Sequence, residues 1–209
     1  MKRRPGESDD DFNRRHNERM AKKKAAREKI IATKTREQGL LIVHSGNGKG
    51  KSTAAFGLVL RALGNGQRVA VVQFVKGKWE TGERSFLTRL PPERIIFHAM
   101  GEGFTWDTQD RARDLAAAAA AWEKAKEFLR DPGCHLVLLD ELNIALRYDL
   151  LPLDEVIAEL RSRPTGTHAV VTGRNAPDEL VAAADLVTEM TLVKHPFRSG
   201  VKAQRGIEF

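Results

Sequence analysis

A stretch with the residue types that bind phosphate lies at residues 45–53, SGNGKGKST. It follows the apolar run LLIVH at 40–44 and precedes an amphipathic segment, which predicts a turn between a strand and a helix. Glycines at 46, 48 and 50 let backbone N–H groups turn toward an anion, and the helix N-terminus adds its positive dipole end. Lys51 offers a positive charge and Ser52 a hydroxyl ligand for a metal. The stretch departs from the usual pattern G-x-x-x-x-G-K-[ST] at Ser45 and still predicts a phosphate-binding loop.

A second chemical element is the apolar segment HLVLLDEL at 135–142, which ends in Asp140 and Glu141. An acidic pair after a buried strand is typical of the partner strand that holds Mg²⁺ directly or through water beside a phosphate loop. The expected metal is Mg²⁺, with Mn²⁺ as the alternative, and its expected ligands are Ser52, Asp140 and Glu141. Glu141 is also of the right type to orient water in an ATP hydrolase.

The two elements together specify a Mg²⁺·nucleoside triphosphate site. No N-K-x-D element follows a later strand, which favours ATP over GTP. The expected ATP-binding residues are Ser45, Gly46, Asn47, Gly48, Lys49, Gly50, Lys51, Ser52 and Thr53. These residues alone leave the reaction open.

An aromatic loop, MGEGFTWDTQD, occupies residues 100–110. It carries Phe104 and Trp106 after two glycines, and Asp107 or Thr108 could cap the helix that follows. The two rings either anchor the loop in the core or face a flat apolar ligand. A basic loop at 75–86, with Lys76, Lys78, Trp79 and Arg84, is expected at the same edge.

The elements that must position these residues alternate between strand and helix from residue 40 onward. The pattern predicts strands at 40–44, 68–75, 93–99, 135–140, 167–173 and 185–193 and helices at 51–64, 108–130, 151–164 and 176–184. Such alternation predicts an α/β fold: a doubly wound, mostly parallel sheet covered on both faces. Ligands of such sheets bind at the carboxyl ends of the strands, where the loops above begin.

The N-terminal segment differs from the rest of the chain in charge. Residues 1–37 hold 13 of the 35 Lys/Arg and 7 of the 28 Asp/Glu, so most of the formal net charge of +7 lies there. We expect residues 1–12 to be disordered and a helix with a thin apolar stripe from about 13 to 37. The predicted organisation is a basic extension at 1–38 and a catalytic domain at 39–209. Because the catalytic domain is nearly neutral, no nucleic-acid partner is expected.

Cysteine content and hydropathy restrict where the protein works. The single cysteine, Cys134, excludes an internal disulfide and fits a reducing cytoplasm. No apolar stretch approaches the roughly 20 residues needed to cross a bilayer, and the N-terminus lacks the apolar region of a secretory signal. We therefore expect a cytoplasmic protein with no membrane partner.

Five motifs in order resemble the phosphate-loop family of ATP:corrinoid adenosyltransferases. They are GNGKGKSTAAFGLVLRALGNG, VVQFVKGKWETGER, MGEGFTWDTQD, LVLLDEL and VKHPFRSGVKAQRGIEF, and the resemblance runs in order from about Gly39 to Phe209. Members of this family commonly carry a small hydroxyl residue before GNGKGK, so Ser45 is expected within it. The resemblance implies a P-loop NTPase fold of the RecA-like kind with an N-terminal helical extension.

The resemblance also implies an activity. The family transfers the 5′-deoxyadenosyl group of ATP to the Co(I) of cob(I)yrinic acid a,c-diamide or cob(I)alamin and releases triphosphate, in adenosylcobalamin biosynthesis and corrinoid salvage. It implies catalytic roles for Lys51, Phe104, Trp106 and Glu141: Lys51 with the phosphates, Glu141 as a metal ligand, and the two aromatic residues against the corrinoid, where they exclude its lower axial ligand.

The implied partners are ATP, the corrinoid, an electron donor such as a reduced flavin or flavoprotein, and a second copy of the chain in a homodimer. In the family the N-terminal helix folds over the active site. Two other hypotheses stay open at this point. One is a RecA-like ATP hydrolase, and the other is a nucleic-acid-binding module that uses the basic helix.

Overall fold

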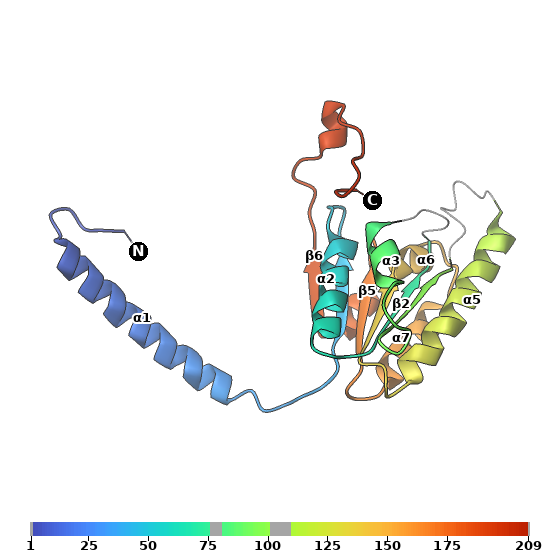
Figure 1. The fold of residues 1–209 in the computed structure, drawn as a ribbon, viewed down its shortest axis with the longest axis horizontal. Helices are drawn as coiled ribbons and strands as arrows, with labels where there is room; N and C mark the ends of the chain where they lie inside the picture. Colours follow the sequence, from blue (N-terminus) through green and yellow to red (C-terminus); the bar gives the residue numbers. More distant parts are fainter. Residues whose placement is uncertain (1, 76–80, 101–109, 209) are drawn as a thin grey trace. The chain divides into compact units, whose positions relative to one another are not determined.

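The computed structural model describes residues 2–75, 81–100 and 110–208 (Figure 1). The chain divides into two compact units, Met1–Glu37 and Gln38–Phe209. Within the described residues, no helix combines the length and the apolar character that a membrane span requires.

The first unit is a single helix, α1 (Asp9–Ala32), in which no residue is buried. The Ser8 side chain accepts a hydrogen bond from the Asp11 backbone N–H, and Asp9, Asp10 and Asp11 fill the first turn. Acidic residues at this end complement the helix dipole. The expectation of disorder over residues 1–12 was therefore wrong for residues 9–12, and the helix ends at Ala32, before the expected boundary at 37.

The second unit is built on one six-stranded sheet in the order β3-β2-β4-β5-β1-β6, in which every pairing is parallel. This confirms the predicted α/β sheet. The strands are β1 (Leu41–Ser45), β2 (Val69–Gln73), β3 (Ile95–Ala99), β4 (Leu136–Asp140), β5 (His168–Thr172) and β6 (Leu186–Glu189). The strand β1, which leads into the phosphate loop, lies between β5 and β6, and the acidic strand β4 lies between β2 and β5.

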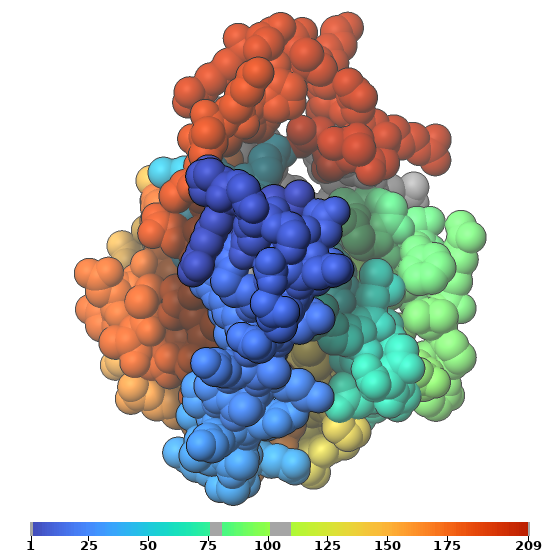
Figure 2. Space-filling model, turned by 90° about the vertical axis from the view of Figure 1, so that its left-hand side faces the viewer, coloured from blue at the N-terminus to red at the C-terminus, as the bar shows by residue number. Residues whose placement is uncertain are grey.

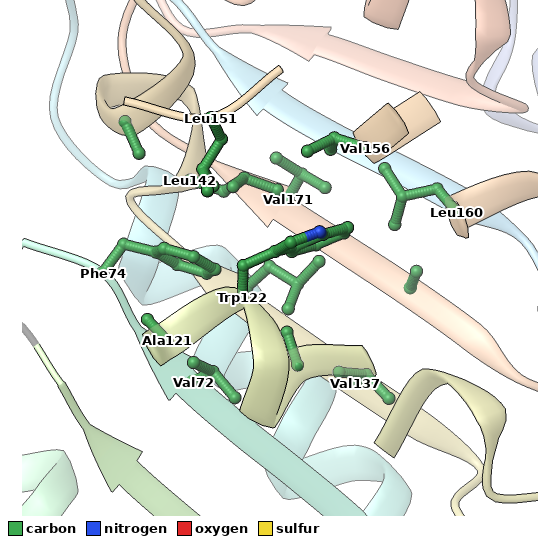
Figure 3. Packing of buried hydrophobic residues seen from close by; sticks show 14 of the residues in the cluster. Val72, Phe74, Ala121, Trp122, Val137, Leu142, Leu151, Val156, Leu160 and Val171 are labelled. Atoms are coloured by element: carbon green, nitrogen blue, oxygen red, sulfur yellow. The ribbon is translucent and has the colours of Figure 1, made fainter. Parts of the chain in front are cut away.

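Helices cover both faces of the sheet, because neighbouring strand residues point to opposite sides and both sets are apolar. On one face, α2 (Lys51–Gly64) packs on the central strands and α3 (Gly82–Leu87) on β3. The other face is covered by α5 (Arg111–Arg130), α6 (Leu142–Arg147), α7 (Leu153–Ser162) and α8 (Asp178–Ala183). In this second core Trp122 of α5 lies among Leu142, Val156, Leu160 and Val171 (Figure 3).

Several boundaries differ from the sequence prediction. The short helices α3 and α6 and the 3₁₀ turn η1 (Pro196–Ser199) were not predicted. Helix α5 is capped by Asp110, whose side chain accepts a hydrogen bond from the Arg113 N–H. The proposed caps Asp107 and Thr108 lie outside the described residues. Strand β6 ends at Glu189 and not at 193, and the next residue, Met190, bonds to the phosphate loop.

The C-terminal segment, residues 190–208, extends from β6 at the end of the second unit where the strands have their carboxyl ends (Figure 1). It is the red segment at the top of the space-filling view (Figure 2). Several large apolar side chains in it are exposed, including Val193, Phe197 and Ile207. Its last residues nevertheless reach the phosphate loop, through an ion pair described below.

Candidate active site

The phosphate loop joins the end of β1 to the start of α2, as the sequence predicts. Gly46 has φ of 94° and Gly50, which precedes the first helical residue, has φ of 102°. Both values lie in the left-handed region that glycine enters without steric cost. The loop therefore adopts the strand–turn–helix geometry in which backbone N–H groups gather at a helix N-terminus and bind anions.

The phosphate loop is held from outside by Met190, the residue after β6. The Gly48 N–H donates to the Met190 carbonyl at 2.6 Å, and the Met190 N–H donates to the Ser45 carbonyl at 2.9 Å. A Cβ on Gly48 would lie 2.7 Å from the same carbonyl oxygen, and one on Gly46 would clash with it as well. These glycines are required by the close approach of β6 as well as by phosphate access.

Ser45, the residue that departs from the common pattern, has a structural partner. It is buried, and its Oγ accepts a hydrogen bond from the Ala176 N–H at 3.0 Å. Ala176 lies in the loop between β5 and α8. The serine hydroxyl thus ties the start of the phosphate loop to the neighbouring loop, which glycine at this position could not do.

Lys51 lies against the phosphate loop and is 8% exposed. Its Nζ donates to the carbonyl oxygens of Gly46 at 2.8 Å and Gly48 at 2.6 Å. Burial lowers the pKa of Lys51, and the negative charge of Glu141 acts in the opposite direction. Lys51 and Glu141, which were predicted as site residues from two different motifs, therefore lie close enough to interact electrostatically.

The two expected acidic ligands have different surroundings. Asp140 is fully buried at the end of β4, and each of its carboxylate oxygens accepts a hydrogen bond: Oδ2 from Gln73 Nε2 at 2.8 Å and Oδ1 from Thr172 Oγ1 at 2.7 Å. Glu141 is half-buried and has left-handed backbone angles, φ 64° and ψ 20°. Ser52 is half-buried in the first turn of α2.

The donor set fits a hard cation that also binds phosphate. Ser52 and Glu141 offer a hydroxyl and a carboxylate oxygen, the ligand types that Mg²⁺ prefers when phosphate and water complete its shell. No group of three or more His, Cys, Asp or Glu side chains that could hold a metal by itself occurs among residues 2–75, 81–100 and 110–208.

Two further groups at the phosphate loop were not given a site role from the sequence. The C-terminal Glu208 forms an ion pair with Lys49, which lowers the pKa of the Glu208 carboxyl. Arg174, exposed in the loop after β5, lies close enough for its charge to lower the pKa of Lys51. Arg174 sits one residue past the end of a predicted strand region, and its position at a carboxyl end was the available signal.

The structure brings together the phosphate loop, Lys51, Asp140 and Glu141 at one edge of the sheet. Asn47, Lys49 and Thr53 are exposed at the same loop. The aromatic residues Phe104 and Trp106 lie outside the described residues. So do Lys76, Lys78 and Trp79 of the basic loop; its Arg84 belongs to α3.

Comparison with known protein families gives two matches along the chain. Residues 37–209 match the family described as ATP:corrinoid adenosyltransferase BtuR/CobO/CobP. Residues 6–31, which include most of α1, match the family described as Cob(I)alamin adenosyltransferase N terminal. The first unit, Met1–Glu37, contains the whole of the match at 6–31, and the match at 37–209 begins at the last residue of that unit.

Relatives with high identity carry a consistent name. The chain is 58% identical to a corrinoid adenosyltransferase of Sinorhizobium sp, over 98% of this chain and 95% of the relative. It is 57% identical to one of Pseudomonas aeruginosa, over 93% and 96%. The corrinoid adenosyltransferase CobA of Salmonella typhimurium is 46% identical, over 93% and 98%. Among solved structures, the RadB recombinase resembles 77% of this chain and 78% of its own at a TM-score of 0.43 and 15% identity.

Proposed function

The chain belongs to the ATP:corrinoid adenosyltransferase family, and from this premise we propose how its own residues carry out the transfer. It is a corrinoid adenosyltransferase, a transferase of cobalamin biosynthesis whose substrates are ATP and a corrinoid. The corrinoid classes we propose are cob(I)yrinic acid a,c-diamide and cob(I)alamin.

In the proposed reaction the nucleophile is the electron pair of the substrate's Co(I), which attacks the 5′-carbon of the ATP ribose. A cobalt–carbon bond forms, the C5′–O bond breaks, and its electron pair leaves on the triphosphate. The nucleophile carries no proton, so the enzyme needs no general base. Catalysis then consists of positioning the two substrates and stabilising the negative charge that grows on the leaving group.

The phosphate loop is suited to that second task. We propose that backbone N–H groups of the loop and Lys51 bind the triphosphate as its charge develops, and that the charge of Arg174 adds to theirs. We propose that Lys51 exchanges the carbonyl oxygens of Gly46 and Gly48, which it contacts here, for phosphate oxygens. On this account the loop holds an intact triphosphate as a departing group, and no P–O–P bond is hydrolysed.

We propose Mg²⁺ as the metal, held by Ser52 and Glu141 together with phosphate oxygens and water, and by Asp140 directly or through water. When bound, the metal supplies additional positive charge to the triphosphate. Glu141 is a ligand in this scheme and not a base for water, in contrast to its role in a hydrolase. Mn²⁺ is the expected substitute because it accepts the same oxygen ligands.

We propose that Phe104 and Trp106 pack against the corrinoid and exclude its lower axial ligand. Apolar rings cannot ligate cobalt, so they suit this task. Removal of an axial donor makes Co(II) easier to reduce to Co(I) by lowering the energy of the orbital that accepts the electron. The electron comes from a separate donor, for which a reduced flavin or flavoprotein is the proposed class. We also propose a cytoplasmic homodimer.

One observation carries the proposal: the phosphate loop with Lys51 follows β1 and Glu141 follows β4, both at the carboxyl ends of parallel strands, in a chain whose residues 37–209 match the transferase family. The test supplies the protein with Mg²⁺·ATP, a chemical reductant and cob(I)alamin or cob(I)yrinic acid a,c-diamide. We expect one triphosphate for each light-sensitive cobalt–carbon bond formed. Release of ADP and phosphate in place of triphosphate would contradict the proposal and favour the hydrolase.

A further inference from the structure

The backbone of Glu141 is unusual for its residue type. Among the described residues, only Glu141, Asp149 and Asn175 combine a positive φ with a side chain. Asp and Asn enter the left-handed region more readily than other residues with a side chain, because their short polar side chains can bond to the local backbone. A glutamate in this conformation persists only where its surroundings determine it, and such residues concentrate at functional sites.

One side chain holds the Glu141 backbone in place. The Glu141 N–H donates to Thr172 Oγ1 at 2.9 Å, and the same hydroxyl donates its hydrogen to Asp140 Oδ1 at 2.7 Å. Thr172 is fully buried and is the last residue of β5, the neighbour of β4. An anionic acceptor polarises the hydroxyl, which makes its oxygen a better acceptor for the Glu141 N–H.

The hydrogen-bond chain continues onto a third strand. Gln73, the last residue of β2, is 2% exposed, and its Nε2 donates to Asp140 Oδ2 at 2.8 Å. Gln73 and Asp140 are also paired in the β2–β4 register. The last residues of three adjacent strands, Gln73, Asp140 and Thr172, therefore form one buried hydrogen-bond chain. Its final hydrogen bond is between Thr172 and the Glu141 backbone.

A second contact fixes the residues on the other side of Glu141. Asn143 Nδ2 donates to the Gly173 carbonyl at 3.1 Å. Gly173 has φ of 130°, and a Cβ there would lie 2.7 Å from the Asn143 Cβ. The turn that contains Glu141 is thus held to the end of β5 both before and after the residue.

We propose that Thr172, supported by Gln73 and Asp140, is a positioning residue that fixes the backbone of Glu141 and so directs its carboxylate toward the metal-bound triphosphate. The role of Asp140 is then to orient Thr172, in addition to any contact with the metal. This inference rests on the proposed function, because it assigns Glu141 the task of binding the metal. Residues that orient a ligand in this way commonly affect metal affinity or activity by about 10–100-fold when they are changed.

The test compares Thr172→Val, which keeps the shape and removes the hydroxyl, with Thr172→Ser, which keeps the hydroxyl. The matched control is Thr167→Val. Thr167 immediately precedes β5, at the opposite end of the strand from Thr172; it is buried, and its hydroxyl donates to the Cys134 carbonyl at 3.0 Å. The control removes a buried threonine hydroxyl of the same kind without touching the turn that contains Glu141.

The first measurement is the affinity of the protein for Mn²⁺ in the presence of ATP and the absence of any corrinoid. Electron paramagnetic resonance monitors the binding. We expect Thr172→Val to weaken Mn²⁺ binding by about 10–100-fold and Thr172→Ser to restore it to within about threefold. Thr167→Val should bind Mn²⁺ as the unchanged protein does. Equal affinity in Thr172→Val and the unchanged protein would overturn the proposal.

The second measurement is amide hydrogen exchange of Glu141 in ¹⁵N-labelled protein. Loss of the acceptor in Thr172→Val should accelerate exchange at this amide by about tenfold or more, which Thr167→Val should not do. If circular dichroism shows that Thr172→Val does not fold, Gln73→Leu is tested in its place. This variant removes the hydrogen bond from Gln73 to Asp140, at the other end of the hydrogen-bond chain, and a smaller loss of Mn²⁺ affinity is expected. Unchanged affinity in a folded Gln73→Leu would then overturn the proposal.

The outcomes for the positioning role and for the proposed function are separable. If the unchanged protein forms no cobalt–carbon bond and releases ADP, the transfer scheme fails, whatever the Thr172 variants do. If it forms the bond and releases triphosphate while Thr172→Val keeps full Mn²⁺ affinity, only the positioning role fails.

Discussion

The carboxyl ends of the strands and helix α1 differ in the kind of interaction that stabilises their structure. At the sheet edge, Asp140, Thr172 and Gln73 are buried and bonded to one another across three strands. In α1 no residue is buried, and its interactions include the Ser8 cap and local ion pairs such as Arg15 with Glu7, which precedes the helix. The first region depends on long-range packing, whereas the second depends on neighbours in sequence.

The difference indicates which region can hold functional side chains in fixed conformations. A left-handed glutamate or a buried lysine needs surroundings that cannot relax, and only a packed sheet supplies them. A solvated helix is held by contributions of a few tenths of a kcal/mol each, so it adjusts readily to a new environment. We therefore expect substitutions at the sheet edge to have large effects and those in α1 to have small ones.

The largest expected effect is that of Lys51→Ala on activity. Loss of one preorganised positive group at the leaving triphosphate should lower the transfer rate by about 10³-fold, or ~4 kcal/mol. Triphosphate release under saturating ATP measures it. Because the hydrogen bonds of the Lys51 Nζ go to carbonyl oxygens of the phosphate loop, the variant should fold normally by circular dichroism. Near-normal turnover would show that this loop does not hold the triphosphate.

Core truncation should give the next largest effect. Leu160 of α7 is fully buried beside Trp122, so Leu160→Ala should lower the free energy of unfolding by about 2–5 kcal/mol (Figure 3). Ile31 of α1 is 57% exposed, and Ile31→Ala should change it by no more than about 0.5 kcal/mol. Urea denaturation followed by tryptophan fluorescence measures both. Similar losses for the two variants would remove the contrast between the regions.

The sequence was informative where a pattern is local. The run LLIVH followed by SGNGKGKST predicted β1, the phosphate loop and α2, and the apolar segments predicted all six strands. The strands β1, β2 and β4 are buried throughout, and buried parallel strands need continuous apolar residues. The residues that resemble the transferase family also identified the activity that the family matches support.

Long-range contacts could not be predicted from local patterns. The contact of Met190 with Gly48, and that of Ser45 with Ala176, join segments more than 130 residues apart, and no local pattern indicates either. Thr172 resembled an ordinary β-branched strand residue. The available signal was its place as a polar residue at the end of a strand, which becomes meaningful only when the strand order sets β5 beside β4.

Removal of residues 1–37 should have a smaller effect on stability than core truncation. Both hydrophobic clusters of the described structure are built from residues 40–184, so the remaining chain keeps its core. We expect the thermal midpoint to change by less than about 3 °C, which corresponds to less than ~1 kcal/mol for a domain of this size. Differential scanning calorimetry measures it. A fall of more than about 10 °C would show that α1 contributes to the packing of the second unit.

The smallest expected effect is the pH dependence of α1. Arg15 donates two hydrogen bonds to Glu7, at 2.7 and 2.5 Å, and the Arg4 N–H donates a third, which together lower the pKa of Glu7 from 4.5 to about 2. A carboxyl with a depressed pKa stabilises the folded helix above pH 4.5, and this contribution is lost as pH falls through about 2.

The carboxyl resonance of Glu7, followed by NMR from pH 6 to pH 2, tests this assignment. In the unchanged protein its midpoint should lie well below 4.5, and in Arg15→Ala it should return toward that value, because the hydrogen bonds from Arg15, the main cause of the shift, have been removed. Salt should reduce the shift, since an exposed pair is screened by mobile ions. A midpoint near 4.5 in both proteins would mean that solvent already competes successfully for the pair. The order in α1 would then come from its cap and helix propensity alone, and the contrast with the buried chain at Asp140 would be sharper.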